Sequence, residues 1–435
     1  MKNQMSIKEF ARYTVPNVMG MIGLSCYILA DTFFVAKGLG ANGLTALNLA
    51  IPVYSFIHGS GLMLGMGGAT KYSIYKGQKD SRHSNRLFTN TIYSTAVLAC
   101  IFVLIGLFLS EGISTLVGAD SEVFAMTNTY IKVILLFAPV FMMNDVLICF
   151  VRNDGNPRLS MFAMLGGSLF NIIFDYIFIF PFHMGIFGAV LATGLSPIVS
   201  MLILSKHWFQ KKNEFHMERG KAHLETIRSI AILGVPSLIG ELSSGIVMIV
   251  FNFIILNLLG NVGVAAYGVI ANISLVVISI YTGIGQGMQP LSSIAYGQQD
   301  KTSIKQILRY AIITLLIVSC IIYLLIFFLA DPIAGVFNSE NNKLLQEIAT
   351  LGLKIYFTSV LFIGFNIVIS NYFISTDKAL PAQIISLLRG FILIIPMAFL
   401  LSALANITGV WLALPVTEGL VAIIGFILYK RVSSK

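Results

Sequence analysis

Twelve long apolar segments constrain the fold of this chain more than any other sequence feature. They lie at 13–36, 44–69, 88–110, 127–151, 159–180, 185–205, 231–256, 264–293, 310–330, 349–373, 381–402 and 409–429. Each is long enough to cross a bilayer as a helix, which takes about 20 residues. Little of the 435 residues remains for an extramembrane domain, and 57% of them are hydrophobic. The sequence therefore predicts an all-α polytopic membrane protein with twelve transmembrane helices.

The first half of the sequence repeats in the second half at an offset of 220 residues. The offset pairs identical residues, namely Pro16 with Pro236, Gly20 with Gly240, Gly40 with Gly260, Gly43 with Gly263, Gly65 with Gly285 and Gly67 with Gly287. Six spans per repeat bring both halves into the membrane in the same direction, as in transporters with parallel repeats. We expect two six-helix bundles related by an internal parallel repeat: an N-terminal lobe at 1–205, a cytoplasmic linker at 206–230 and a C-terminal lobe at 231–435.

The positive charges indicate a membrane topology and not a nucleic-acid partner. Of the 28 Lys and Arg residues, 23 fall on the side of the termini and even-numbered loops, and only Lys37 and Lys343 on the other. The positive-inside rule places both termini in the cytoplasm. The first segment lacks a signal-peptide cleavage site, so we expect an uncleaved span, with Ser6 and Glu9 forming a capping box at its start.

Two polar residues stand out in the apolar run at 169–180. Asn171 and Asp175 are one helical turn apart and share a helix face. A carboxylate in the middle of a membrane helix costs at least about 2.5 to 3.5 kcal/mol, and such residues usually face a bundle interior or a wet cavity. From the helical rise, Asp31 in the first span and Thr193 in the sixth lie at a similar depth. These four residues form the candidate site.

The repeat fails at this candidate site. At the repeat offsets, Asp31 is matched by Phe251, and the Asn171 and Asp175 pair by Leu393 and Met397. The polar site therefore belongs to the N-terminal half only, which favours a functional role over a general scaffold role.

Other charges also fall inside apolar segments. Glu241, Arg389 and Glu418 each lie about 12 to 15 Å from the nearer end of a span by the helical rise. One interpretation is that Arg389 pairs with one of the two acids, which eases burial of both charges. The remaining acid would then contact a cationic substrate. Asp145, near Arg152, is interpreted as an anchor for the adjacent loop.

The sequence lacks the motifs of an enzyme. The GxGxxG match at 38–43 lies between two spans with no strand before it, so we interpret it as a chance match in a tight loop. No phosphate-binding loop, nucleophile with a base, or ligand-spaced histidine cluster is present. His58 is interpreted as lining the core or a cavity. The four cysteines lie in apolar segments and are interpreted as core residues: Cys26, Cys100, Cys149 and Cys320. We expect neither enzyme activity nor a cofactor.

Four stretches resemble a known family. They are ADTFFV at 30–35 followed by Gly40 and 46–52, the segment 65–80 that ends in GQKD, RNDGNP at 152–157, and NIIFD at 171–175. Together they resemble the multidrug and toxic compound extrusion (MATE) transporters, over nearly the whole chain. The resemblance implies a bacterial plasma-membrane antiporter that exchanges inward sodium ions or protons for outward amphipathic, often cationic, drugs.

The resemblance also implies roles for individual residues. Asp31, Asn171, Asp175 and Thr193 match the N-lobe cation site of part of the family, and Pro16 matches a proline at which the first helix is proposed to bend. Another branch of the family uses acids in the C-lobe, including one in the tenth span. The segment 356–373 holds no acid here, so no C-lobe cation site is carried over.

Two alternatives stay open. The all-oxygen set suits Na⁺, but two acids in one low-dielectric site repel, so one of them is expected to hold a proton. We expect the two ions to compete for one site, with the proton sufficient on its own. A lipid-linked saccharide flippase of related architecture is the alternative function. It would need several basic residues to hold a pyrophosphate, and only Arg389 is at that depth. The expected partners are small-molecule drugs and the bilayer, for a monomeric protein.

Overall fold

The computed structural model describes residues 5–218, 220, 222–338 and 342–433, and all regular structure among them is helical. Four residues in the charge count fall outside these ranges: Lys2, Arg219, Lys221 and Lys435. The α-helices are α1 Ile7–Gly77, α2 Ser81–Phe108, α3 Ser110–Leu116, α4 Phe124–Leu136, α5 Ala138–Asn153, α6 Pro157–Ile179, α7 Gly185–Leu204, α8 Lys206–Phe209, α9 Leu224–Gly297, α10 Lys301–Phe337, α11 Lys343–Tyr356, α12 Val360–Ser375, α13 Ala379–Leu387 and α14 Ile394–Ser433. A 3₁₀ turn (Phe357–Ser359) joins α11 to α12, and a π-helical turn (Leu388–Ile392) joins α13 to α14.

Within the described residues, eight helices are long and apolar enough to cross a membrane, or nine if the bent pair α4 and α5 forms one span. This number is below twelve because some elements contain more than one apolar segment. The 71-residue α1 and the 74-residue α9 each contain two of them. The prediction of an all-helical membrane protein is confirmed at this level.

Two glycines divide the longest helices. Gly40 in α1 has φ 67° and ψ −159°, and Gly260 in α9 has φ 63° and ψ −155°. No atom lies within 4 Å of a Cβ built on either residue, so the positive φ and not packing requires glycine there. The GxGxxG match lies at the first of these turns, as expected of a tight connection. At the start of α1, the Ser6 side chain accepts a hydrogen bond from the Glu9 amide, which confirms the predicted cap.

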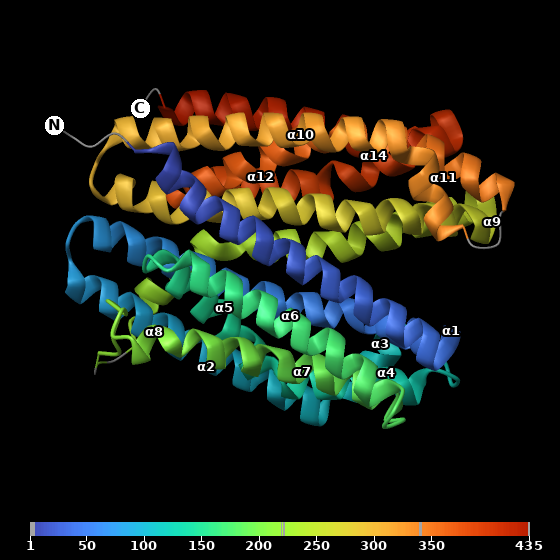
Figure 1. The fold of residues 1–435 in the computed structure, drawn as a ribbon, viewed down its shortest axis with the longest axis horizontal. Helices are drawn as coiled ribbons and strands as arrows, with labels where there is room; N and C mark the ends of the chain where they lie inside the picture. Colours follow the sequence, from blue (N-terminus) through green and yellow to red (C-terminus); the bar gives the residue numbers. More distant parts are fainter. Residues whose placement is uncertain (1–4, 219, 221, 339–341, 434–435) are drawn as a thin grey trace.

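Buried apolar side chains form two separate clusters. One draws on residues 35–230, and the other on 233–421 together with Phe10 and Tyr13 at the start of α1. In Figure 1 the helices coloured blue to green lie together below those coloured yellow to red, with the beginning of α1 reaching the upper group.

Backbone-to-backbone contacts join α1 to α9. A Cβ on Gly67 would overlap the carbonyl oxygen of Ile230, and one on Gly234 would overlap that of Met63. Each position therefore accepts only glycine at this separation of the two helices. Figure 1 places the ends of α1 and α9 near both chain termini, at one end of the molecule.

Candidate functional site

The four predicted site residues come together in the N-terminal half. Asp31 is supplied by α1, Asn171 and Asp175 by α6, and Thr193 by α7. None is more than 7% exposed. The helical spacing places Asn171 and Asp175 on one face of α6, where Asp175 lies near Asp31 and Asn171 contacts Thr193.

Hydrogen bonds join three of these four side chains. The Asn171 amide is best oriented with Nδ2 donating to Asp175 Oδ2 at 2.9 Å, which leaves its oxygen 3.2 Å from Thr193 Oγ1. The carboxyl groups of Asp31 and Asp175 are close neighbours within this site. Because two carboxylates in a buried site repel each other, this pair favours a form in which one member carries a proton.

Two carboxyl oxygens at this site have no hydrogen-bond partner. They are Asp31 Oδ1 and Asp175 Oδ1, and both are buried. Buried polar atoms are nearly always paired, so each exception calls for an explanation. Two such carboxyl oxygens in one buried site fit a small hard cation as well as a proton.

Tyr130 of α4 belongs to the same site and was missed at the level of sequence. It is 4% exposed and lies near Thr193, Asp31 and Asp175. The only available signal was a hydroxyl in an apolar segment, which is unspecific in a chain with 16 tyrosines.

A second group of ionisable residues lines a cavity of about 80 Å³ between the two halves. His58 Nδ1 lies 2.9 Å from Asp145 Oδ2, and Glu241 of α9 lines the cavity from the other half. The interpretation of Asp145 as a loop anchor is therefore wrong, because α5 continues to Asn153 and turns Asp145 into this cavity. Among the described residues, Glu241 has no ion-pair partner.

Arg152 was assigned to a loop, but it lies in α5 and is 1% exposed. Its Nη1 donates to Asn17 Oδ1 of α1 at 3.0 Å and to Gln286 Oε1 of α9 at 2.7 Å. Within the part of the chain that the structure describes, no carboxylate pairs with this guanidinium. Arg152 therefore links the two halves through neutral acceptors.

The structure places Arg389 against Glu418. Arg389 Nη2 lies 2.8 Å from Glu418 Oε1, and its Nε lies 3.1 Å from the same oxygen. Asn366 Nδ2 donates to the other carboxylate oxygen at 2.6 Å. Of the three intramembrane charges outside the N-terminal half, Glu241 is thus the one that faces the central cavity.

Pro16 lies within a continuous helix. The only non-helical backbone in α1 is at Gly40, so α1 is not broken at Pro16 in this structure.

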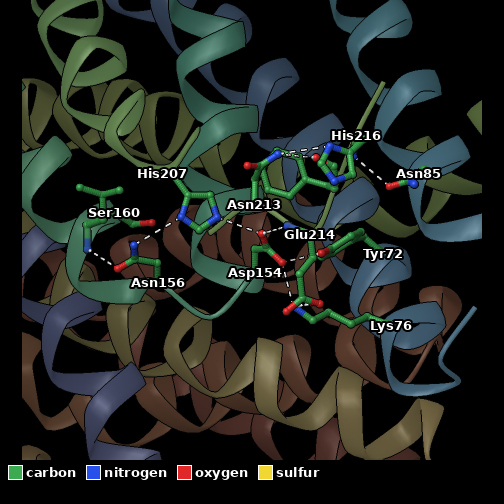
Figure 2. Close-up of polar contacts among 12 residues, drawn as sticks. Tyr72, Lys76, Asn85, Asp154, Asn156, Ser160, His207, Asn213, Glu214 and His216 are labelled. Atoms are coloured by element: carbon green, nitrogen blue, oxygen red, sulfur yellow. Dashed lines mark hydrogen bonds and ion pairs between the residues drawn. The ribbon is translucent and has the colours of Figure 1, made fainter. Parts of the chain in front are cut away.

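Asp154 organises the connection between the halves, although its role was not predicted. It follows α5 and accepts hydrogen bonds from Tyr72 (2.6 Å), Lys76 (2.7 Å), His207 (2.9 Å) and the Glu214 amide (2.8 Å), as Figure 2 shows. Burial alone would raise the pKa of Asp154, but the hydrogen bond from His207 and the charge of Lys76 outweigh it and hold the pKa below its usual range.

The connection from α8 to α9 is accordingly fixed to the N-terminal half. The amides of His216, Glu218 and His223 donate to Asn85, Thr89 and Asn90 of α2, each at 2.9 Å. Phe215 is fully buried, with its ring 4.5 Å from that of Phe88. The described residues between 210 and 223 are thus packed against the helices, and α9 begins at Leu224, inside the predicted linker.

We expect Asp154→Asn to lower the melting temperature of the purified protein, because it leaves His207 without its carboxylate and leaves Lys76 with Glu214 as its one acidic partner among the described residues, at about 3 kcal/mol. The pKa of an aspartate is about 4 in the unfolded chain and is lower for Asp154 in the folded protein. The Asp154 carboxylate therefore stabilises the fold fully above about pH 4, and this stabilisation is lost as the pH falls through the pKa of the folded state. The difference in melting temperature between wild type and Asp154→Asn should stay constant from about pH 7 to pH 5 and become smaller below about pH 4. Fluorescence-detected size-exclusion chromatography after heating measures this difference in melting temperature, with Asp120→Asn as the control variant. A gap that closes between pH 7 and pH 5 would contradict the assignment.

Within the described ranges, no group of three or more His, Cys, Asp or Glu residues is arranged to hold a metal ion. The candidate cation site has only two carboxylates, completed by an amide and a hydroxyl.

Long apolar helices, buried carboxylates inside one half and a cavity between the halves are typical of a membrane transporter. The MatE family model matches residues 16–177 and 236–400, and this chain belongs to that family, the MATE transporters. Members of the family are membrane transporters and not enzymes, and they need no cofactor.

Curated relatives and solved structures agree with this family. The chain is 28% identical to the multidrug export protein MepA of Staphylococcus saprophyticus, over 97% of this chain and 93% of that one. Identity to MepA of Staphylococcus aureus is 27%, with the same coverage. An outward-facing multidrug resistance MATE transporter has a TM-score of 0.91, and a MATE protein in complex with MaL6 has 0.93. Each is 24% identical to this chain and covers 98% of it and 96% of its own length.

Proposed function

We propose that this protein is a multidrug efflux antiporter that exports amphipathic, often cationic compounds across a bacterial plasma membrane in exchange for H⁺ or Na⁺. One observation carries this proposal: the carboxyl groups of Asp31 and Asp175 are neighbours in the N-terminal half, and each has a buried oxygen without a hydrogen-bond partner. Such a pair can take up and release a cation. The pair occurs in one half only, whereas packing features such as the glycine turns recur in both halves, so the pair is not a general feature of the scaffold.

The architecture proposed for this cycle has twelve spans in two lobes with both termini in the cytoplasm. Dividing α1 and α9 at Gly40 and Gly260, and α14 at Asn406, supports this number of spans. The two separate apolar clusters and the two matches of the family model support a repeated unit. Alternating access would then move the two lobes about the contacts near Gly67 and Gly234. The protein would act as a monomer.

Glu241 in the central cavity favours a cationic substrate, although the bases His58 and Arg152 also line this cavity. Asp145 and Glu241 face it from opposite halves, and Asp145 is bonded to His58. A flippase for lipid-linked saccharides would need basic groups free to hold a pyrophosphate. Arg389 is paired with Glu418, and Arg152 is held by Asn17 and Gln286. These contacts favour drug export over the flippase alternative.

Cells that express the protein should accumulate less ethidium than cells with empty vector. Glu241→Gln should weaken export of cationic dyes about tenfold, corresponding to about 1.4 kcal/mol of lost attraction, and should change export of neutral compounds little. Glu122→Gln, an exposed loop substitution, is the matched control. Equal losses for cationic and neutral compounds would reject Glu241 as the cation contact. Ethidium accumulation equal to that with empty vector, with the protein present in the membrane, would reject the transport proposal.

A further inference from the structure

An open groove lies between the beginnings of α1 and α6, outside the candidate cation site and the central cavity. Its volume is about 760 Å³. Its lining is a mixture of charged and apolar side chains: Ser6, Lys8, Glu9, Ala11, Arg12, Val15, Pro16, Arg158, Met161 and Phe162. The groove is at the end of the molecule where both chain termini and α8 lie (Figure 1).

The charge of this groove is positive. Lys8, Arg12 and Arg158 are exposed, whereas Glu9 is its single acid. Among the residues that the structure describes, none of the three basic side chains makes a hydrogen bond or an ion pair. These cations are therefore free to bind an anion, and the two guanidinium groups present the planar donor pattern that suits a phosphate.

The other wall of the groove is apolar and exposed. Val15 is 58% exposed and Phe162 is 56% exposed, and Met161 lies beside them. Along α1, the rise from Lys8 to Val15 is about 10 Å. The basic groups thus lie at the helix ends and the apolar surface lies deeper along the spans. This arrangement suits an amphipathic anion whose charged headgroup lies at the helix ends and whose apolar chain lies along the spans.

We propose that this groove binds one anionic phospholipid, from the leaflet on the side of the chain termini. The headgroup phosphate contacts Lys8, Arg12 and Arg158, and an acyl chain lies along Val15, Met161 and Phe162. Basic groups beside a membrane attract anionic lipids. A soluble phosphate would leave the exposed apolar wall uncovered, so the observations favour the lipid.

The test uses the purified full-length protein in detergent, titrated with phosphatidylglycerol or phosphatidylcholine, with thermal shift and native mass spectrometry as readouts. Phosphatidylglycerol should raise the melting temperature, and one lipid should stay bound in the gas phase. The triple variant Lys8→Gln, Arg12→Gln, Arg158→Gln should bind it about tenfold more weakly. Phe162→Ala should weaken binding without changing the charge.

The matched control removes the same charge elsewhere at that end. Lys301, Lys305 and Arg309 of α10 are also exposed, and their triple glutamine variant should bind phosphatidylglycerol as wild type does. Equal losses in both triples would overturn the proposal, because they would indicate a diffuse charge effect. Equal stabilisation by inorganic phosphate would overturn it in favour of a soluble anion. If the groove triple misfolds, Arg158→Gln alone carries the test, and unchanged lipid retention in it would count against the proposal.

Discussion

Asp31→Asn and Asp175→Asn are each expected to reduce drug resistance to the level of empty vector while leaving the protein in the membrane at normal abundance. Each substitution keeps the side-chain volume but removes the carboxyl group that binds and releases the coupling cation. The remaining acid would lose the neighbouring carboxyl group with which it forms the site. Minimum inhibitory concentrations and ethidium efflux, normalised to membrane abundance, measure the effect.

Asp120→Asn is a suitable control for both variants. Asp120 accepts hydrogen bonds from the amides of Glu122 and Val123 in a loop, and an asparagine oxygen can keep them. Normal resistance in either Asp31→Asn or Asp175→Asn, at wild-type abundance, would reject the N-lobe cation site.

Arg389→Ala is expected to destabilise the fold strongly. Glu418 is 2% exposed, so removing the guanidinium leaves a buried carboxylate without its partner, at about 3 kcal/mol. Lower abundance and a lower melting temperature in detergent should follow. Adding Glu418→Gln should restore part of the loss, because the glutamine carries no charge and its oxygen can still accept from Asn366.

The second double variant separates this pair from the other acid. Arg389→Ala with Glu241→Gln should show additive losses, since Glu241 lies in the central cavity and not against Arg389. Partial recovery in the Glu241 double variant, or none in the Glu418 double variant, would contradict the pairing.

The candidate cation site could be predicted from the sequence because polar residues are rare and costly in a membrane helix. The spacing of Asn171 and Asp175, and the depths of Asp31 and Thr193, were sufficient to bring the four together. The repeat offset likewise identified Gly40 and Gly260, whose positive φ no other residue adopts without strain.

Residues at the helix ends could not be assigned in this way. Hydropathy alone does not fix where α5 ends, so Arg152 was counted with a loop although it is buried between the halves. For the same reason Asp145, inside the segment 127–151, was interpreted as an anchor for that loop. The role of Asp154 depends on hydrogen bonds from residues more than 50 positions away in sequence, His207 and Tyr72 among them. Local sequence spacing does not predict such long-range contacts.

The role of Pro16 remains a family-based hypothesis, since α1 is continuous there. The choice of coupling ion is likewise a proposal. The repulsion between two neighbouring carboxylates at Asp31 and Asp175 favours a proton, whereas the two carboxyl oxygens without partners accommodate either ion.

The most direct test of the cation-coupled account is drug transport in proteoliposomes that hold the purified protein. With sodium absent, an imposed pH gradient should drive drug uptake against its concentration gradient, and Asp31→Asn should abolish that uptake. Adding sodium should compete with protons and slow it. Transport that needs a sodium gradient at constant pH would contradict proton sufficiency, and pH-driven transport that survives in Asp31→Asn would contradict the site itself.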